Sequence, residues 1–156
     1  MNPNTQRTEL WTVDHVACPL TARDAAGAID EIARTLKHAP GVVDLPALTR
    51  AVQVRETHAS TYLGGGVAIP HARTDAVDHL VIGVGLSREG LRWGPSIELA
   101  RLVFLIGVPR DDDQAYLAVV RRITQTVRRL AWIEAAVTCS DAPALVRLLR
   151  DTIAFD

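Results

Sequence analysis

The spacing of apolar residues predicts two helices in the first third of the chain. Apolar side chains recur every three or four positions over residues 25–36, which is typical of a helix with one buried face. Thr21 is expected to open this helix, with Asp24 completing an approximate capping box. Asp44 is expected to cap a second helix that fades near residues 55–59. Its predicted buried positions are Leu45, Leu48 and Val52.

Uninterrupted apolar stretches predict the strands. Residues 102–108 are the most apolar stretch of the chain and predict a central strand that is buried on both faces. Residues 80–86 predict a second strand, and residues 91–93 a short edge strand. Residues 13–20 are consistent with a short strand or an extended lead-in segment. Three consecutive glycines at 64–66 predict a turn.

The last third of the chain predicts further helices. A long helix is expected over residues 114–130, followed by a short one over residues 132–137. Ser140 or Asp141 is expected to cap a last helix. Helices at both ends around a cluster of strands predict a layered α/β fold. The predicted buried face of the long helix carries Leu117, Val120, Ile123, Val127 and Leu130.

Composition and charge narrow the class of protein. The chain has 156 residues, of which 48% are apolar and 4% aromatic, so we expect one domain over 1–156 with an aliphatic core and a frayed N-terminus at 1–9. A net charge of -1 argues against a nucleic-acid partner. No apolar run approaches the ~20 residues of a membrane span, and we expect a cytoplasmic protein. Cys18 and Cys139 are interpreted as small buried hydrophobic residues.

The segment around His71 carries the candidate chemistry. Residues 67–69 predict a short strand stopped by Pro70, so that the C-terminal end of this strand delivers His71. Imidazole is a nucleophile near neutral pH because its ordinary pKa is ~6.5. The chain lacks the sequence motifs of serine hydrolases, zinc proteases and P-loop nucleotide-binding proteins. A lone nucleophilic His with an Arg nearby suits phosphoryl transfer, in which the protein mainly positions groups and neutralises charge.

Polar groups upstream of His71 are suited to binding a phosphoryl group. Arg55 offers the planar fork of donors that phosphate geometry favours. Ser60, Thr61 and the amides of the glycine turn could donate further hydrogen bonds.

Each of these features also has a plainer interpretation. Arg55 could end its helix by binding the C-terminal carbonyl groups, and the glycines could form an ordinary turn. His58 and His79 are expected to be exposed bystanders; the alternative is a metal site that they form together with His71. We expect no metal and no cofactor.

The same segment resembles the signature of type-2 enzyme IIA domains of the bacterial phosphoenolpyruvate-dependent phosphotransferase system. These are the fructose, mannitol and nitrogen-regulatory domains, and the resemblance extends over roughly residues 13–151. The matching pieces are Arg55-Glu56, Ser60-Thr61, the glycine turn, Ala68-Ile69-Pro70-His71 and the strand that ends in Val108-Pro109.

The resemblance implies a fold, a reaction and partners. The implied fold is a mixed β-sheet flanked by helices on both faces. His71 would be phosphorylated on Nε2, with Arg55 supporting the phosphoryl group. The donor would be the phosphorylated histidine-containing carrier protein, and the acceptor a Cys of an enzyme IIB domain or a regulatory target protein. The chain would then be a free-standing phosphotransferase component of sugar transport or nitrogen regulation.

Tyr116 departs from the family pattern. It stands where these domains usually carry a second active-site His. A phenol can donate a hydrogen bond to a phosphoryl oxygen, but with a pKa of ~10 it cannot carry positive charge. We therefore expect Tyr116 to bind phosphate, unless it is simply packed with its hydroxyl at the surface. The alternative function is a non-catalytic regulatory binding module of the same fold, impaired in transfer by this replacement.

Overall fold

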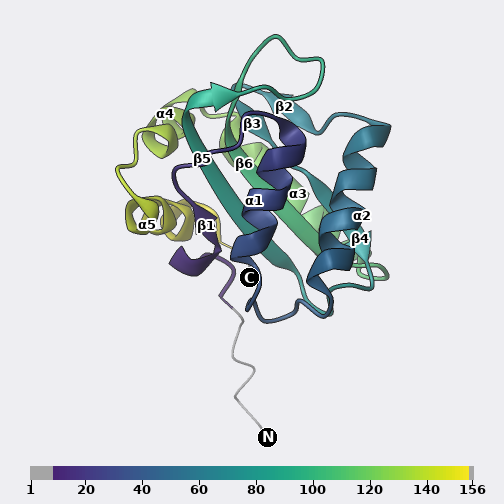
Figure 1. Cartoon of the computed structure of the whole chain (residues 1–156). Coiled ribbons are helices and arrows are strands. Elements are labelled where there is room, and N and C mark those ends of the chain that lie inside the picture. Colours follow the sequence, from purple (N-terminus) through teal and green to yellow (C-terminus); the bar gives the residue numbers. More distant parts are fainter. Residues whose placement is uncertain (1–8, 155–156) are drawn as a thin grey trace, which may run out of the picture.

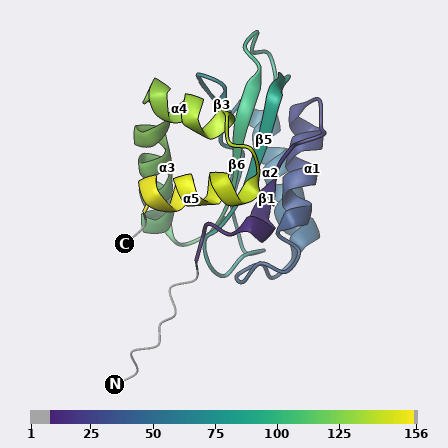
Figure 2. The same cartoon turned by 90° about the vertical axis from the view of Figure 1, so that its left-hand side faces the viewer.

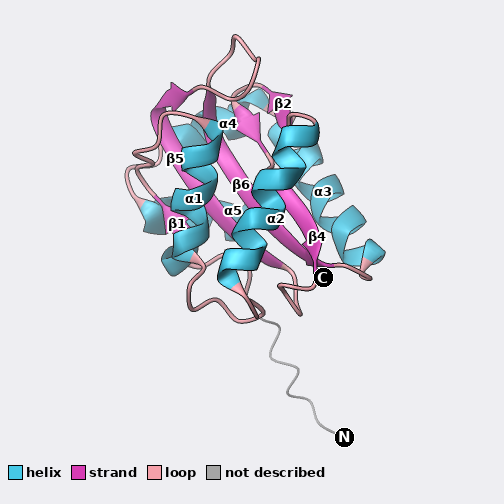
Figure 3. Cartoon of the chain, turned by 45° about the vertical axis from the view of Figure 1, so that its right-hand side comes forward, coloured by secondary structure: helices cyan, strands magenta, loops and turns pink. Residues whose placement is uncertain are grey.

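The computed structural model describes residues 9–154, which form three layers (Figures 1 and 2). A six-stranded mixed sheet lies in the middle, α1 and α2 cover one face, and α3, α4 and α5 cover the other (Figure 3). This confirms the predicted α/β fold with helices on both faces of the sheet. The predicted fraying concerns residues that lie, all but Glu9, outside the described part of the chain.

The elements follow the chain in an order close to the predicted one. The helices are α1 (Ala25–Thr35), α2 (Leu45–His58), α3 (Asp113–Val127), α4 (Leu130–Val137) and α5 (Ala142–Thr152), preceded by a 3-10 turn at Val13–His15. The strands are β1 (Val16–Ala17), β2 (Tyr62–Gly64), β3 (Val67–Ala68), β4 (His71–Thr74), β5 (Val81–Leu91) and β6 (Ala100–Pro109).

Strand β6 is the centre of the sheet. It pairs antiparallel with β5 on one side and parallel with both β3 and β4 on the other. Val67 of β3 pairs with Leu102, and His71 of β4 pairs with Ile106, so β3 and β4 follow one another along the same edge of β6. The interruption falls at Pro70, whose carbonyl accepts a 2.9 Å hydrogen bond from the amide of Ile106.

His71 therefore opens a strand of its own. The predicted short strand before Pro70 is present as β3 and His71 follows its end, but the prediction missed that the strand resumes at His71. Pro70 has no N–H to give to the sheet, but its fixed φ is compatible with extended backbone, so the strand resumes directly after it. The separate edge strand predicted over residues 91–93 was also wrong, because Leu91 belongs to the long β5.

Side chains of β6 alternate between two hydrophobic clusters. Leu102, Phe104 and Ile106 pack under α3, α4 and α5, whereas Val103 and Leu105 face α1 and α2. All five are fully buried, which confirms the predicted central strand.

The glycines of β5 allow α1 to approach the sheet closely. A Cβ added at Gly85 would lie 2.5 Å from Leu20 Cδ1 and 2.7 Å from Ile32 Cδ1. Leu20 and Ile32 are both buried in the cluster between the sheet and α1. The Ile-Gly-Val-Gly pattern of this strand thus places small residues under a helix and large ones on the opposite face.

Aspartates cap the helices, with one correction to the prediction. Asp24, Asp44 and Asp141 each accept a hydrogen bond from an amide in the first turn of α1, α2 and α5, respectively. Thr21 does not open α1. Its amide and hydroxyl instead bind the carboxylate of Glu31.

The buried face of α3 differs from the prediction. Leu117 is 63% exposed and Leu130 70% exposed, whereas Val119, Ile123 and Val127 are the buried residues of α3. Leu130 is exposed because α3 ends at Val127, so Leu130 belongs to α4 and cannot extend the stripe. Leu117 is exposed because it lies two residues before Val119, on a different side of the helix. The two cysteines are free and half-buried, so their predicted full burial was also wrong.

Candidate active site

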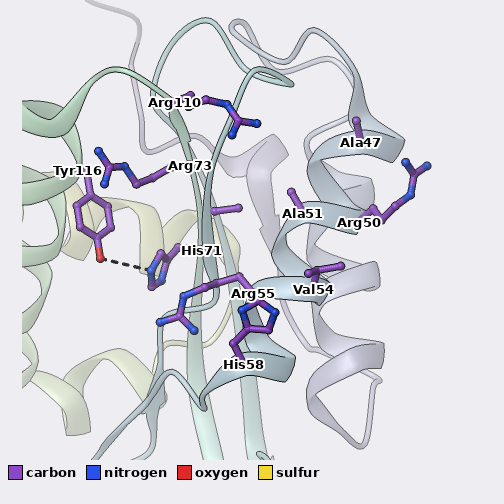
Figure 4. A pocket seen from close by; sticks show the side chains of 11 residues that line it. Ala47, Arg50, Ala51, Val54, Arg55, His58, His71, Arg73, Arg110 and Tyr116 are labelled. Atoms are coloured by element: carbon purple, nitrogen blue, oxygen red, sulfur yellow. Dashed lines mark hydrogen bonds between the residues drawn. The ribbon is translucent and has the colours of Figure 1, made fainter.

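The candidate site lies at an open edge of the sheet, between α2 and the start of α3. Within the described residues, β4 pairs with β6 alone, so its other edge faces a cavity of about 680 Å³ (Figure 4). Cationic and aromatic groups supply the polar lining, and no carboxylate of the described residues lines it. The polar lining consists of His71, Tyr116, His58, Arg50, Arg55, Arg73 and Arg110.

The backbone before His71 fixes the orientation of its ring. Nδ1 lies 2.8 Å from the carbonyl oxygen of Ile69. A carbonyl can only accept, so Nδ1 carries the ring hydrogen and Nε2 keeps its lone pair. Because Pro70 interrupts the strand, the Ile69 carbonyl is free to turn to the ring instead of to a neighbouring strand. With only 8% of the residue exposed, Nε2 is a positioned nucleophile rather than a mobile one.

The surroundings of His71 favour the neutral ring. Burial is the main cause that lowers its pKa below the usual 6.5, and the positive charge of Arg55 lowers it further. The hydrogen bond to Ile69 and the charge of Glu56 oppose this shift without reversing it. At neutral pH the ring therefore has an unprotonated Nε2, which nucleophilic attack requires.

Tyr116 faces the nucleophilic atom of His71. It lies near the start of α3, and its hydroxyl is 3.4 Å from Nε2, with 5.5 Å between the two ring centroids. Since Nε2 has a lone pair, the phenol is the donor in this contact. Figure 4 shows the hydroxyl pointing at the imidazole, so the alternative in which it only reaches the surface is not what the structure shows.

Arg55 both binds a carbonyl at the end of its helix and lines the cavity of His71. Near the end of α2, its Nη1 donates a 3.0 Å hydrogen bond to the carbonyl of Ala59, just past the helix. The guanidinium also lies beside His71 in the cavity (Figure 4). A guanidinium has five N–H groups, so one bond to a carbonyl leaves donors for a phosphoryl group.

Thr61 and Ser60 lie outside the lining of the cavity. The amide and hydroxyl of Thr61 bind the two carboxylate oxygens of Glu56 at 2.9 and 2.6 Å. Glu56 also accepts a 2.8 Å hydrogen bond from the indole of Trp93. The hydroxyl of Ser60 accepts a hydrogen bond from the amide of Tyr62. Phosphate binding by Ser60 and Thr61 stays a prediction, and the contacts favour a role in holding the end of α2.

The glycine turn is remote from the cavity of His71. Its three residues have φ of 99°, 63° and 88° and join β2 to β3, which confirms the predicted turn. The amide of Gly66 donates to the hydroxyl of Tyr62. Gly64 and Gly65 line a different hollow, beside α4.

Sequence reasoning missed several cations of the site. Arg50, Arg73 and Arg110 line the cavity, as does His58, which was expected to be a bystander. Arg73 could have been found, because it follows His71 by two positions on a strand and so shares its face. The positions of Arg50 and Arg110 depend on how α2 and the end of β6 meet, which no local pattern shows.

The structure also bears on metals and membranes. No three His, Cys, Asp or Glu side chains among residues 9–154 are grouped closely enough to hold a metal ion. The ring of His79 contacts the carboxylate of Asp78 and does not line the cavity. None of the described helices is both long and apolar enough to cross a membrane.

Comparison with known proteins shows the family of this chain. Residues 9–152 match the family described as "Phosphoenolpyruvate-dependent sugar phosphotransferase system, EIIA 2". The chain is 30% identical over 123 residues to the fructose-specific EIIABC component of the phosphotransferase system of Bacillus subtilis (strain 168). The aligned stretch covers 78% of this chain but only 19% of that relative.

Solved structures share the fold. The nitrogen regulatory protein IIA-Ntr of Neisseria meningitidis superposes with a TM-score of 0.80 at 23% identity, over 91% of this chain and 97% of the other. In a complex of mannitol enzyme IIA with phosphorylated enzyme IIB from Escherichia coli, the matching chain has a TM-score of 0.77 at 22% identity, over 90% of this chain and 96% of the other.

Proposed function

Since this chain belongs to the EIIA 2 family of the phosphoenolpyruvate-dependent sugar phosphotransferase system, we propose that it is a phosphocarrier that holds a phosphoryl group on Nε2 of His71. The donor in this proposal is the phosphorylated histidine-containing carrier protein. The acceptor is a Cys of an enzyme IIB domain or a regulatory target protein.

The position of Nε2 carries the proposal. Its lone pair points into a cavity lined by arginines, while Nδ1 is held by the Ile69 carbonyl 2.8 Å away. The lowered pKa keeps His71 neutral near pH 7. A buried, neutral and oriented imidazole beside cations is suited to receive a phosphoryl group, because the site supplies both the nucleophile and charge stabilisation.

The transfer step needs no proton movement at His71. The lone pair of Nε2 forms a bond to phosphorus, the bond from phosphorus to the donor nitrogen breaks, and that electron pair stays on the donor. The phosphorylated ring carries the positive charge. Nδ1 keeps its hydrogen and donates it to the Ile69 carbonyl, and this hydrogen bond stabilises the charged ring. In the second transfer, an acceptor thiolate attacks phosphorus and the N–P electron pair returns to Nε2.

Named relatives support two settings for the carrier. A fructose-specific EIIABC component among the relatives supports sugar transport, and the solved complex of enzyme IIA with phosphorylated enzyme IIB supports a IIB acceptor. The IIA-Ntr likeness is one of fold. Tyr116, which cannot carry the charge of a second His, favours the alternative: a non-catalytic regulatory binding module of the same fold that is impaired in transfer and acts through its contact with a target protein.

Incubation with phosphoenolpyruvate, enzyme I and the carrier protein tests the proposal. We expect intact-mass measurement to show the gain of one phosphoryl group that is lost in acid. The gain should vanish in His71→Gln and persist in His38→Gln, which removes an exposed imidazole outside the cavity. A chain that takes no phosphate, or one that is still labelled in His71→Gln, would contradict the proposal. An unlabelled wild type that still binds a target protein would support the regulatory module instead.

A further inference from the structure

Arg73 lines the site although it was not among the residues predicted for it. It follows His71 by two positions on β4, and side chains two apart on a strand point to the same face. Their partners on β6, Ile106 and Val108, both belong to the cluster under α3, α4 and α5. Figure 4 shows the Arg73 side chain in the cavity, next to the ring of Tyr116. Arg73 thus approaches the nucleophile from the side of α3, and Arg55 from the side of α2.

The contacts of Arg73 connect it both to His71 and to the start of α3. Its guanidinium carbon lies 5.3 Å from the centroid of the Tyr116 ring, whose hydroxyl faces Nε2 of His71. Its Nη2 forms an ion pair with the carboxylate of Asp113, the first residue of α3. These contacts make a short path from His71 through Tyr116 and Arg73 to Asp113.

The ion pair between Arg73 and Asp113 is weak enough for Arg73 to change its partner. The Arg73 side chain is 41% exposed and that of Asp113 is 71% exposed, and ion pairs with such exposure contribute little to stability. A phosphoryl group carries about two negative charges, whereas the carboxylate of Asp113 carries one. Its three acceptor oxygens also match the fork of donors on the guanidinium. A phosphoryl group on Nε2 is therefore the stronger partner for Arg73.

Tyr116 creates the need for such a cation. Its hydroxyl can donate one hydrogen bond to a phosphoryl oxygen but adds no charge. The guanidinium that lies against its ring can supply that charge from the same direction.

We propose that Arg73 is a phosphoryl-binding residue that leaves Asp113 for the phosphoryl group when His71 is phosphorylated. The inference rests on the proposed function of His71 and adds to it a second cation and a released carboxylate. Phosphorylation would then free the charge of Asp113 at the start of α3, on the surface, where a partner protein could read it.

The two members of the ion pair give opposite predictions, which separates this role from a structural one. Arg73→Gln should slow phosphorylation of His71 by about tenfold to a hundredfold, as expected when a charge-assisted hydrogen bond is lost. Arg73→Lys should recover part of that loss. Asp113→Asn should speed phosphorylation up to about fivefold, because Arg73 no longer has a competing partner. The control Arg34→Gln removes an exposed guanidinium of α1 outside the cavity and should leave the rate unchanged.

The rates are measured by intact mass with two donors, the phosphorylated carrier protein and phosphoramidate, a small phosphoryl donor that needs no docking surface. The predicted pattern should appear with both. Slowing of Arg73→Gln and Asp113→Asn by similar factors would indicate a structural ion pair and overturn the inference. An Arg73→Gln chain labelled at the wild-type rate would overturn it too, as would slowing with the protein donor alone. A wild-type chain that neither donor labels would overturn the proposed function itself and, with it, this inference.

Discussion

The hydroxyl of Tyr116 lies 3.4 Å from Nε2 of His71, the atom on which we propose the phosphoryl group is carried. In this position the phenol can donate a hydrogen bond to an oxygen of the phosphoryl group, but it cannot neutralise the negative charge of that group. We therefore expect Tyr116 to support transfer less strongly than a protonated His would.

Two substitutions at position 116 test this relationship. Tyr116→Phe should slow labelling of His71 by about tenfold, the usual effect of one lost hydrogen bond to a charged group. Tyr116→His should speed labelling, because an imidazolium can add positive charge next to the phosphoryl oxygens. Tyr62→Phe is the matched control, since that hydroxyl bonds to Glu98 and Gly66 far from the cavity. Equal rates in all four proteins would remove Tyr116 from the site.

Arg55 should hold down the pKa of His71. Burial lowers that pKa first, and the Arg55 charge lowers it further, so the wild-type ring stays neutral as the pH falls through 6.5. In Arg55→Ala the pKa should rise, and the ring should gain its proton at a higher pH than in wild type. NMR titration of the ring nitrogens measures both values. The labelling rate of the variant should be lower at every pH, and should begin to fall at a higher pH than that of wild type.

That result would be contradicted by an unchanged or lowered pKa in Arg55→Ala. Because Arg55 also donates to the Ala59 carbonyl, a thermal unfolding curve of the variant should accompany the titration. A native-like unfolding transition shows that the pKa change reflects the lost charge.

Thr61 should matter for stability more than for chemistry. Thr61→Val keeps the shape but removes the hydroxyl that binds Glu56, leaving part of a carboxylate without its partner. We expect a loss of about 1–3 kcal/mol in the free energy of unfolding, measured with urea. Labelling of the folded variant should change less than in Arg55→Ala. A stable Thr61→Val protein with strongly slowed labelling would instead support direct phosphate binding by Thr61.

How far the sequence predicts this site depends on whether its residues share a motif. His71, Arg55 and Tyr116 were each expected in the site, and the structure brings them together. The hydrogen bond from Trp93 to Glu56 was not expected, because it depends on how the end of α2 meets a loop that lies 37 residues away in the sequence.

In the fold, too, local features were predicted and features that depend on distant contacts were not. Capping by Asp44 is local and was predicted, as was the buried strand around Phe104. The resumption of the strand at His71 was not, because it needs Ile106 of a strand more than thirty residues away to donate to Pro70. The exposure of Leu130 was missed because the end of α3 at Val127 depends on the turn into α4.

Gly85 should tolerate no side chain. In Gly85→Ala the new Cβ would lie 2.5 Å from Leu20 and 2.7 Å from Ile32, inside van der Waals contact. We expect a loss of about 1–3 kcal/mol in the free energy of unfolding, because α1 has to move away from β5. Gly27→Ala is a control in the first turn of α1, where the nearest contacts of the new Cβ are longer, at 3.1 and 3.2 Å, and alanine has the higher helix propensity. A Gly85→Ala protein as stable as wild type would contradict the close packing of α1 on the sheet.

The most direct test of the whole account is to identify the ring nitrogen that carries phosphorus. The phosphorylated protein, labelled with ¹⁵N at histidine, can be analysed by long-range ¹H–¹⁵N correlation and by nitrogen–phosphorus coupling. The account predicts that phosphorus is bonded to Nε2 of His71 and that Nδ1 keeps its hydrogen toward the Ile69 carbonyl. Phosphorus on Nδ1, or on any other histidine, would contradict it.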